Sequence, residues 1–271
     1  MPVGVKPLDP PALPGAILSF DFDGTLHHPA DDPPVSPRLF LTLERLRREK
    51  GALWGINTGR SIAHVVEGLV ESRFPFTPDW VVAREREIWL PHPSGRWTPL
   101  DPWNTECALE LHRFLKHVGG TLDAIRREVE EHTGATWIEQ PGDPAGLISR
   151  TEEEMAWIME RVVALAAGDP DLGWQRNSIW LRFGHKKYQK GSSLAEVARH
   201  FGLDAARTFA IGDSHNDFEM LSPVVAAMFA CPGNAVTEIR THVVLGGGYP
   251  CRSMHSEGCV EALEHFFGAG L

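Results

Sequence analysis

The sequence has little of what marks secreted or membrane-spanning proteins. It contains four cysteines among 271 residues, and no two of them form a C-x-x-C pair. This spacing argues against a disulfide framework or a zinc site and predicts free thiols in a reducing cytoplasm. The longest apolar run is the eight residues 224–231, far below the roughly 18 that a membrane-spanning helix needs. We therefore expect no membrane partner.

Positive charge is also scarce. The chain has 26 Lys and Arg against 36 Asp and Glu, a formal net charge of −10. A protein that holds nucleic acid by bulk electrostatics carries the opposite balance, so no nucleic-acid partner is expected. Any anionic ligand then needs a local cationic group or a metal ion. The hydrophobic fraction of 42% and charged fraction of 23% are typical of a globular protein.

Strands and helices alternate along the first part of the chain. Residues 1–15 hold five prolines and one lysine, which predicts a disordered leader. Short apolar runs then alternate with segments of helical periodicity, and this alternation predicts a parallel sheet with crossover helices. The expected strands are 16–20, 52–57 and 80–83, and the expected helices are 37–50 and 62–74.

The middle third of the chain differs in composition and in the expected order of its elements. Seven of the nine tryptophans fall between residues 84 and 182, in a stretch where helical segments flank short strands. This pattern predicts a small antiparallel sheet with helices on one face, inserted as a separate unit over 84–184. The first domain, 16–83, resumes over 185–271. The expected elements of the two later parts are helices 105–132, 152–167 and 191–201, strands 135–139, 146–149, 173–176, 178–183 and 208–211, and a helix opening at 218–221.

Two carboxylates follow the first predicted strand in the segment Asp21-Phe22-Asp23-Gly24-Thr25. Strand ends of an open α/β sheet form its binding crevice, and alternation places both carboxylates on one side. Such a pair can hold Mg²⁺, attack phosphorus through one carboxylate and shuttle a proton through the other. An Asp-rich turn without chemistry is the competing interpretation.

Two shorter signals are weak on their own. Thr58 and Gly59 follow the second strand and would offer a hydroxyl and backbone N–H groups to an anion, although a helix N-cap explains Thr58 equally well. Lys190 opens a predicted helix, where its ammonium would neutralise a phosphoryl group. Lys186 and Lys187 compete for that role.

Two more carboxylates follow the last predicted strand in the segment Gly212-Asp213-Ser214-His215-Asn216-Asp217. One carboxylate can reach a metal ion directly and the other through water. A capped left-handed turn is the alternative, but an apolar strand that ends in Gly-Asp, with Asp217 four residues later, fits metal coordination better.

Read together and in order, these motifs resemble the haloacid dehalogenase-like superfamily of aspartyl-phosphate enzymes. The insert between the second and third motifs is similar to the large αβ cap of the Cof-like and sucrose-phosphatase-like branch. The resemblance implies an α/β fold with a Rossmann-like parallel-sheet core, helices on both faces, and an inserted α+β cap. One departure stands out, because the third strand usually leads into an Asn-Gly turn in that branch. Here residues 83–87 read Ala-Arg-Glu-Arg-Glu.

The resemblance also implies roles for individual residues. Asp21 would be the nucleophile and Asp23 the general acid and base. Thr58 and Lys190 would complete the catalytic set, with Ser214 lying near the metal. Phosphoryl oxygens would contact Gly24, Gly59 and Asn216, and Mg²⁺ would be held by Asp21, Asp23, Asp213 and Asp217.

The function expected from this resemblance is a Mg²⁺-dependent phosphatase that hydrolyses a small phosphorylated metabolite of the sugar-phosphate type, with the cap reading the substrate. A phosphomutase of the phosphomannomutase type is a second interpretation, and a non-catalytic sugar-phosphate-binding protein is a third. The motifs are common to all substrates of such enzymes, so they name neither the metabolite nor the oligomeric state.

Overall fold

The structure is a computed structural model that describes residues 6–139 and 144–269. It divides into two compact units, one formed by the chain up to Asn104 together with Lys190 onward, and the other by Thr105–Gln189. The insertion therefore begins at residue 105 rather than at the predicted residue 84, and it ends at residue 189 rather than 184.

Unit 1 is built on one eight-stranded sheet of order β12-β11-β10-β1-β2-β3-β4-β5. From β12 to β3 the strands are parallel, whereas β4 and β5 pair antiparallel at the edge. The parallel part confirms the α/β fold class. The strands are β1 (Ala16–Phe20), β2 (Ala52–Asn57), β3 (Trp80–Ala83), β4 (Glu87–Pro91), β5 (Trp97–Pro99), β10 (Thr208–Ile211), β11 (Met228–Cys231) and β12 (Tyr249–Pro250).

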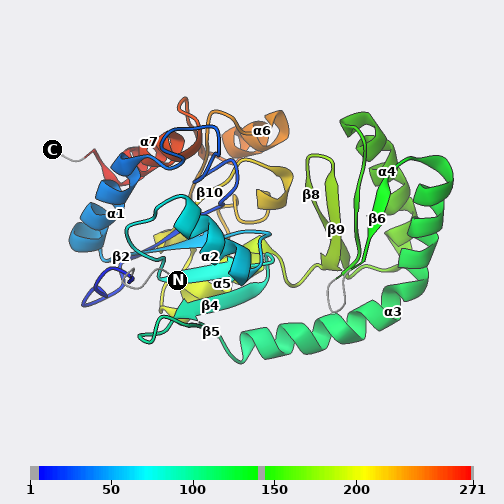
Figure 1. Ribbon diagram of the computed structural model, residues 1–271, viewed down its shortest axis with the longest axis horizontal. Coiled ribbons are helices and arrows are strands. Elements are labelled where there is room, and N and C mark those ends of the chain that lie inside the picture. The colour runs from blue at the N-terminus through cyan, green and yellow to red at the C-terminus, as the bar shows by residue number, and fades with distance from the viewer. Residues whose placement is uncertain (1–5, 140–143, 270–271) are drawn as a thin grey trace. The chain divides into compact units, whose positions relative to one another are not determined.

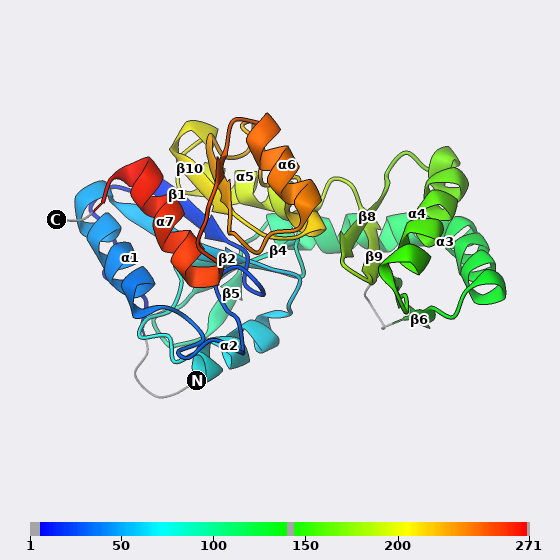
Figure 2. The same cartoon turned by 90° about the horizontal axis from the view of Figure 1, so that it is seen from above.

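Helices cover both faces of this sheet (Figures 1 and 2). On one face, α1 (Pro37–Lys50), α2 (Ile62–Glu71) and α7 (His255–Phe267) pack on alternate strand residues such as Leu18 and Phe20. On the other, α5 (Lys190–His200) and α6 (Thr237–Leu245) pack on residues such as Ile17. The alternation of side chains along each strand thus feeds two separate apolar layers.

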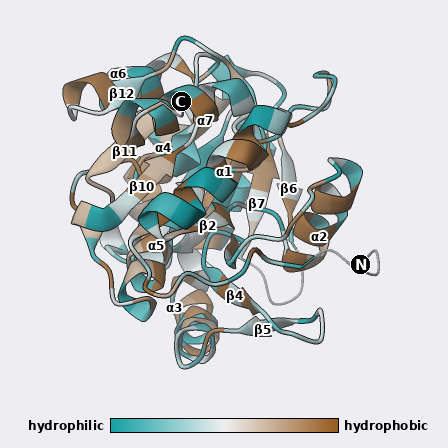
Figure 3. Cartoon of the chain, turned by 90° about the vertical axis from the view of Figure 1, so that its left-hand side faces the viewer, coloured by the Kyte–Doolittle hydropathy of each residue, from teal (hydrophilic) through white to brown (hydrophobic). Residues whose placement is uncertain are grey.

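Helix α1 shows how local sequence sets these elements. Ser36 caps its N-terminus by accepting a hydrogen bond from the backbone of Arg38, Pro37 occupies the first turn, and Gly51 ends the helix at φ +61°. Leu39, Leu43 and Leu46 of this helix are buried in the core, and most of its charged residues face water. Arg47 is the buried exception and pairs with Asp79. Hydrophobic and hydrophilic residues alternate along the helix in Figure 3. None of the described helices is long and apolar enough to cross a membrane.

The turn between β3 and β4 explains the shifted boundary. Arg84 and Glu85 both have left-handed backbone, with φ of 50° and 66°, and the Arg86 N–H bonds back to the Ala83 carbonyl at 3.1 Å. This geometry closes a tight hairpin, so the chain pairs back onto the main sheet instead of leaving it. Two consecutive left-handed residues that are not glycine cost roughly 1–2 kcal/mol each. The charged sequence therefore adopts the turn at a conformational cost.

Unit 2 is an α+β unit. Its antiparallel sheet has the order β6-β7-β9-β8, and one apolar cluster joins it to α3 and α4. The expectation of helices on one face of a small antiparallel sheet is confirmed. The elements are α3 (Trp103–His132), which starts in unit 1, β6 (Thr136–Ile138), β7 (Gly146–Ile148), α4 (Glu152–Leu165), β8 (Leu172–Asn177) and β9 (Trp180–His185).

Three expectations need correction. Residues 218–221 form turns after a short 3₁₀ segment, His215–Asp217, and no helix opens there; Pro223 follows closely and disfavours helical backbone before it. Residues 6–15 are not disordered: Pro7 bridges Thr77, and the Gly15 N–H donates to the Gly51 carbonyl. Residues 1–5 of the predicted leader lie outside the described residues. Three of the seven tryptophans that we assigned to the insert belong to unit 1: Trp89, Trp97 and Trp103.

Candidate active site

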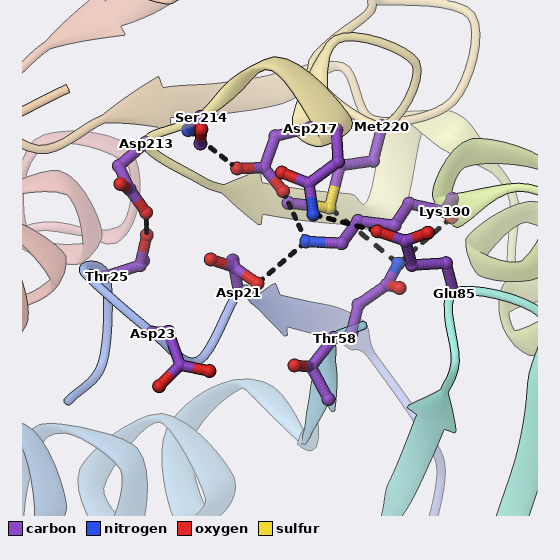
Figure 4. Close-up of polar contacts among 12 residues, drawn as sticks. Asp21, Asp23, Thr25, Thr58, Glu85, Lys190, Asp213, Ser214, Asp217 and Met220 are labelled. Carbon is purple, nitrogen blue, oxygen red and sulfur yellow. Dashed lines mark hydrogen bonds and ion pairs between the residues drawn. The ribbon is translucent and has the colours of Figure 1, made fainter. Parts of the chain in front are cut away.

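The motif residues meet at one edge of the main sheet. Strands β10, β1 and β2 are adjacent and parallel, so their carboxyl ends deliver the segments that begin at Asp213, Asp21 and Thr58 to the same place. Lys190 reaches this edge from the first turn of α5. Figure 4 shows these side chains converging.

A buried ammonium lies between two carboxylates at the centre. The Lys190 Nζ is 2.7 Å from Asp21 Oδ1 and 2.6 Å from Asp217 Oδ1 (Figure 4). Burial alone lowers the pKa of Lys190, but the charges of Asp21, Asp217 and Glu85 outweigh it and hold that pKa above its ordinary value. Lys190 is therefore charged, and its ammonium contacts one of the two carboxylate oxygens of Asp21.

Negative charge still exceeds positive charge in this cluster. Burial, with the charges of Asp217 and Asp213 added, raises the pKa of Asp21 well above its ordinary value despite the ammonium of Lys190. The pKa of Asp213 rises to about 6, mainly through burial and then through the charge of Asp217. A divalent cation would relieve both effects.

Three carboxylates have the arrangement that a hard cation requires. Ligand oxygens of Asp21, Asp213 and Asp217 lie within 4.8 Å of one another, and carboxylate oxygens are the donors that Mg²⁺ prefers. Both oxygens of Asp217 already accept hydrogen bonds, from Lys190 and from the Ser214 N–H at 3.0 Å. These residues fit Mg²⁺, with Asp217 suited to contact through water.

Two glycines make room for the carboxylates. Gly24 has φ +79°, and a Cβ there would lie 2.7 Å from Asp213 Oδ2. A Cβ on Gly212 would lie 2.3 Å from Asp217 Cγ. Thr25 then fixes Asp213 by donating a 2.6 Å hydrogen bond to its Oδ1. The glycines of both motifs are thus required by close approach.

Thr58 is not a helix cap. Helix α2 is capped by Ser61, whose side chain accepts from the His64 N–H. Thr58 is buried at the end of β2, where its Oγ1 accepts from the Arg60 N–H at 3.2 Å. The geometry thus removes the competing interpretation of this motif and leaves the hydroxyl beside the carboxylates. Gly59 follows it in the same loop.

Asp23 is held apart from the metal cluster. Arg60 donates to both of its carboxylate oxygens, through Nε at 2.8 Å and a terminal nitrogen at 2.6 Å. The Asp23 side chain is about half exposed and points away from Asp213 and Asp217 (Figure 4). Its carboxylate is therefore not among the three that converge, and a metal contact from Asp23 would involve its backbone. Sequence reasoning assigned no role to Arg60, although it follows Gly59 directly in the chain.

Asn216 has a partner that the sequence did not reveal. Its amide Nδ2 donates to the Glu85 carboxylate at 2.8 Å, and Glu85 is only 4% exposed. The only signal for Glu85 was the charged turn in place of Asn-Gly. Lys186 and Lys187, in contrast, bond within unit 2, to the Pro170 carbonyl and to Glu110 at 2.7 Å each. Among the three candidate lysines, Lys190 is the one that meets Asp21.

The chain is similar to several known proteins. Residues 147–243 match a family model described as haloacid dehalogenase-like hydrolase. A protein of Streptococcus pyogenes, named as a candidate phosphatase, is 24% identical over 77% of this chain and 84% of its own length. A phosphoglycolate phosphatase of Methanobrevibacter smithii is 33% identical over 30% of this chain and 32% of its own.

Solved structures share the fold across nearly the whole chain. The sucrose-phosphatase of Synechocystis, in complex with sucrose and phosphate, superposes with a TM-score of 0.72 at 19% identity and covers 94% of this chain and 98% of that one. A subclass IIB sugar phosphatase gives a TM-score of 0.60 at 17% identity over 94% of this chain and all of its own. At these identities the likeness establishes the fold.

Proposed function

We propose that this chain is a haloacid dehalogenase-like hydrolase and that it is a Mg²⁺-dependent phosphatase that acts through an aspartyl phosphate. The observation that carries the proposal is the convergence of Asp21, Asp213 and Asp217 around Lys190 at the sheet edge. One ammonium and a metal ion would supply the positive charge that a phosphate dianion needs in a chain of net charge −10.

Asp21 is placed to attack phosphorus. One carboxylate oxygen forms a bond to the phosphoryl group while the ester P–O bond breaks, and the Lys190 ammonium at 2.7 Å opposes the rise in the pKa of Asp21 that burial causes. Lys190, the Thr58 hydroxyl and backbone N–H groups near Gly24 and Gly59 contact the phosphoryl oxygens.

Asp23 carries the proton in both half-reactions. In the first it donates a proton to the leaving alcohol oxygen, and in the second it takes one from the water that attacks the aspartyl phosphate, which restores Asp21 and releases inorganic phosphate. Arg60 holds Asp23 by two hydrogen bonds. Arg60 is therefore placed to orient Asp23 for the proton transfer.

The metal would be held by Asp21, Asp213 and the backbone of Asp23, with Asp217 behind water. When bound it supplies charge neutralisation between the carboxylates and the phosphate. The pKa values of Asp21 and Asp213, raised mainly by burial and further by neighbouring carboxylates, support a site built for an added cation.

The substrate class is proposed from likeness. The names of two similar structures refer to a sucrose-phosphatase and a sugar phosphatase, which supports a small sugar-phosphate type of substrate read by unit 2. All four cysteines are buried thiols outside any disulfide bond, which supports a reducing compartment such as the cytoplasm.

The test is phosphate release from p-nitrophenyl phosphate and a panel of sugar phosphates, with Mg²⁺ and with EDTA. We expect steady turnover that EDTA abolishes, Mg²⁺ restores, and excess Ca²⁺ inhibits, because Ca²⁺ binds the same oxygens at longer distance. Asp23→Asn should lose most activity on alkyl phosphates, whose leaving groups need the proton. Turnover without any divalent ion, or no release from any substrate, contradicts the proposal.

A further inference from the structure

Glu85 is a buried carboxylate that the proposed mechanism does not use. It lies in the β3–β4 turn with φ of 66° and an exposed fraction of 4%. An acidic side chain is rarely buried unless it is paired, and a left-handed backbone is uncommon for glutamate. Both features mark a residue held in place by its surroundings.

Three separate segments fix the backbone and side chain of Glu85. Its N–H donates to the Thr58 carbonyl at 2.9 Å, and its carbonyl accepts from the Ser193 hydroxyl at 3.2 Å. Its carboxylate accepts from the Asn216 amide at 2.8 Å. Thr58 and Asn216 both belong to the proposed phosphate site, so the turn is tied directly to the groups that meet phosphate.

Glu85 also adds a charge where the site is already negative. It acts on Lys190 as a third carboxylate besides Asp21 and Asp217, and Figure 4 shows it on the side of Lys190 away from Asp21. A negative charge beside Lys190 weakens the binding of a dianion at the same place, and because Glu85 and Lys190 are both buried, water screens these charges poorly.

We propose that Glu85 is a positioning residue that anchors the Asn216 amide and, through its charge, limits how tightly the site holds phosphate. The inference deepens the proposed phosphatase function and rests on it. A site that bound phosphate too tightly would release its product slowly. The carboxylate thus sets the balance between capture and release, while the hydrogen bond keeps Asn216 oriented.

Two substitutions separate charge from anchoring. Glu85→Gln keeps an acceptor for Asn216 and removes the charge, whereas Glu85→Ala removes both. Glu87→Gln is the matched control, because Glu87 lies in the same hairpin and contacts Arg84 and Arg86 at 3.3 and 3.9 Å. All three variants lose one negative charge from one short segment.

The experiment measures binding of inorganic phosphate by calorimetry with Mg²⁺ present, together with kcat and KM. For Glu85→Gln we expect the phosphate dissociation constant and KM to fall by about threefold or more, a change of the size that one buried charge produces. For Glu85→Ala we expect kcat to fall by about tenfold relative to Glu85→Gln, because a displaced contact costs orientation. Glu87→Gln should match the unsubstituted protein.

Unchanged phosphate binding in Glu85→Gln overturns the charge role, and equal kcat in the two Glu85 variants overturns the anchoring role. A similar change in Glu87→Gln would show a general effect of hairpin charge and would also overturn the proposal. Calorimetry needs no turnover, so Glu85 can fail this test while the phosphatase activity stands. Absent turnover with normal phosphate binding would instead count against the phosphatase function.

Discussion

Arg60 holds Asp23 by two hydrogen bonds, at 2.8 and 2.6 Å, across the 37 residues that separate them in the chain. The same guanidinium lies 4.7 Å from the centre of the Phe22 ring. Arg60 is therefore fixed from two sides and, in turn, fixes the carboxylate that we propose as general acid and base. A residue that orients Asp23 should matter most where proton transfer matters most.

The first prediction concerns this pair. Arg60→Gln keeps a hydrogen-bond donor but cannot donate two hydrogen bonds to Asp23 at once. We expect kcat to fall by about tenfold, which is less than the loss expected when the general acid itself is removed. The loss should be larger for alkyl phosphates than for p-nitrophenyl phosphate, whose leaving group needs little protonation. Arg45→Gln, which affects a pair with Glu49 and a hydrogen bond to the Gly268 carbonyl, is the control. Equal losses on both substrates would contradict an effect through Asp23.

The second prediction is a pH dependence of metal binding. The pKa of Asp213 is about 6 against an ordinary 3.8, mainly through burial. Between these values the folded, metal-free protein binds more protons than the unfolded chain, so this group's contribution to stability is lost as pH rises through about 4 to 6. Mg²⁺ needs the ionised carboxylate, so its stabilising effect should grow over the same window.

Thermal unfolding with and without Mg²⁺ measures this effect. We expect the Mg²⁺-induced rise in Tm to be clearly larger near pH 7.5 than near pH 5, because near pH 5 the cation must first displace a proton from Asp213. Asp213→Asn should lose most of the Mg²⁺ effect at both values. The same rise in Tm at both pH values in the unsubstituted protein would contradict the cluster as the metal site.

The third prediction concerns stability. Lys190→Met leaves Asp21 and Asp217 buried without their ammonium, so the free energy of unfolding without metal should fall by about 3 kcal/mol, the cost of breaking a buried ion pair. Mg²⁺ should restore part of this loss but no turnover. Lys186→Met, which removes an exposed ammonium that donates to the Pro170 carbonyl, should change stability by less than about 0.5 kcal/mol. Urea unfolding compares the two; equal effects would refute the special position of Lys190.

The fourth prediction assigns specificity to unit 2. Replacing residues 105–189 by the corresponding unit of a related sugar phosphatase should change the ranking of substrates and keep the Mg²⁺ requirement, because all the converging carboxylates lie outside that span. A cut at residue 84 would instead remove Glu85 and two strands of the main sheet. A folded chimera with the original ranking would place specificity in unit 1, for example in the loop 27–35.

The sequence predicted the strands that position the site because each ends in a motif. The three predicted strands are followed by Asp21, Thr58 and Gly212, which mark the strand ends directly, and parallel strands bring their ends together. Sequence reasoning identified Asp21, Lys190, Asp213 and Asp217 as candidates, and the structure brings these four side chains together. Their catalytic roles stay predictions until the variants are measured.

What the sequence could not predict depends on long-range contacts. The hairpin of β3 and β4 was missed because the turn is a run of charged residues and lacks the glycine or asparagine that usually indicates a tight turn. The left-handed residue Glu85 is instead stabilised by hydrogen bonds to Thr58 and Ser193, which belong to other segments. Glu85 accepts a hydrogen bond from Asn216, which is 131 residues away in the chain. A local sequence pattern cannot predict a contact between residues so far apart. The prediction of a helix opening at 218–221 was wrong, because the chain forms turns there and its apolar residues, such as Met220 and Leu221, pack into the core from those turns.

The identity of the nucleophile is the central claim, and Asp21→Asn tests it most directly. The amide nearly keeps the shape of the carboxylate but is a poor nucleophile and a weak metal ligand. Steady-state phosphate release at saturating Mg²⁺ should fall by at least about a thousandfold, while the circular dichroism spectrum stays that of the folded protein. A folded Asp21→Asn variant that retained a tenth or so of the turnover would contradict nucleophilic attack by Asp21 and with it the proposed mechanism.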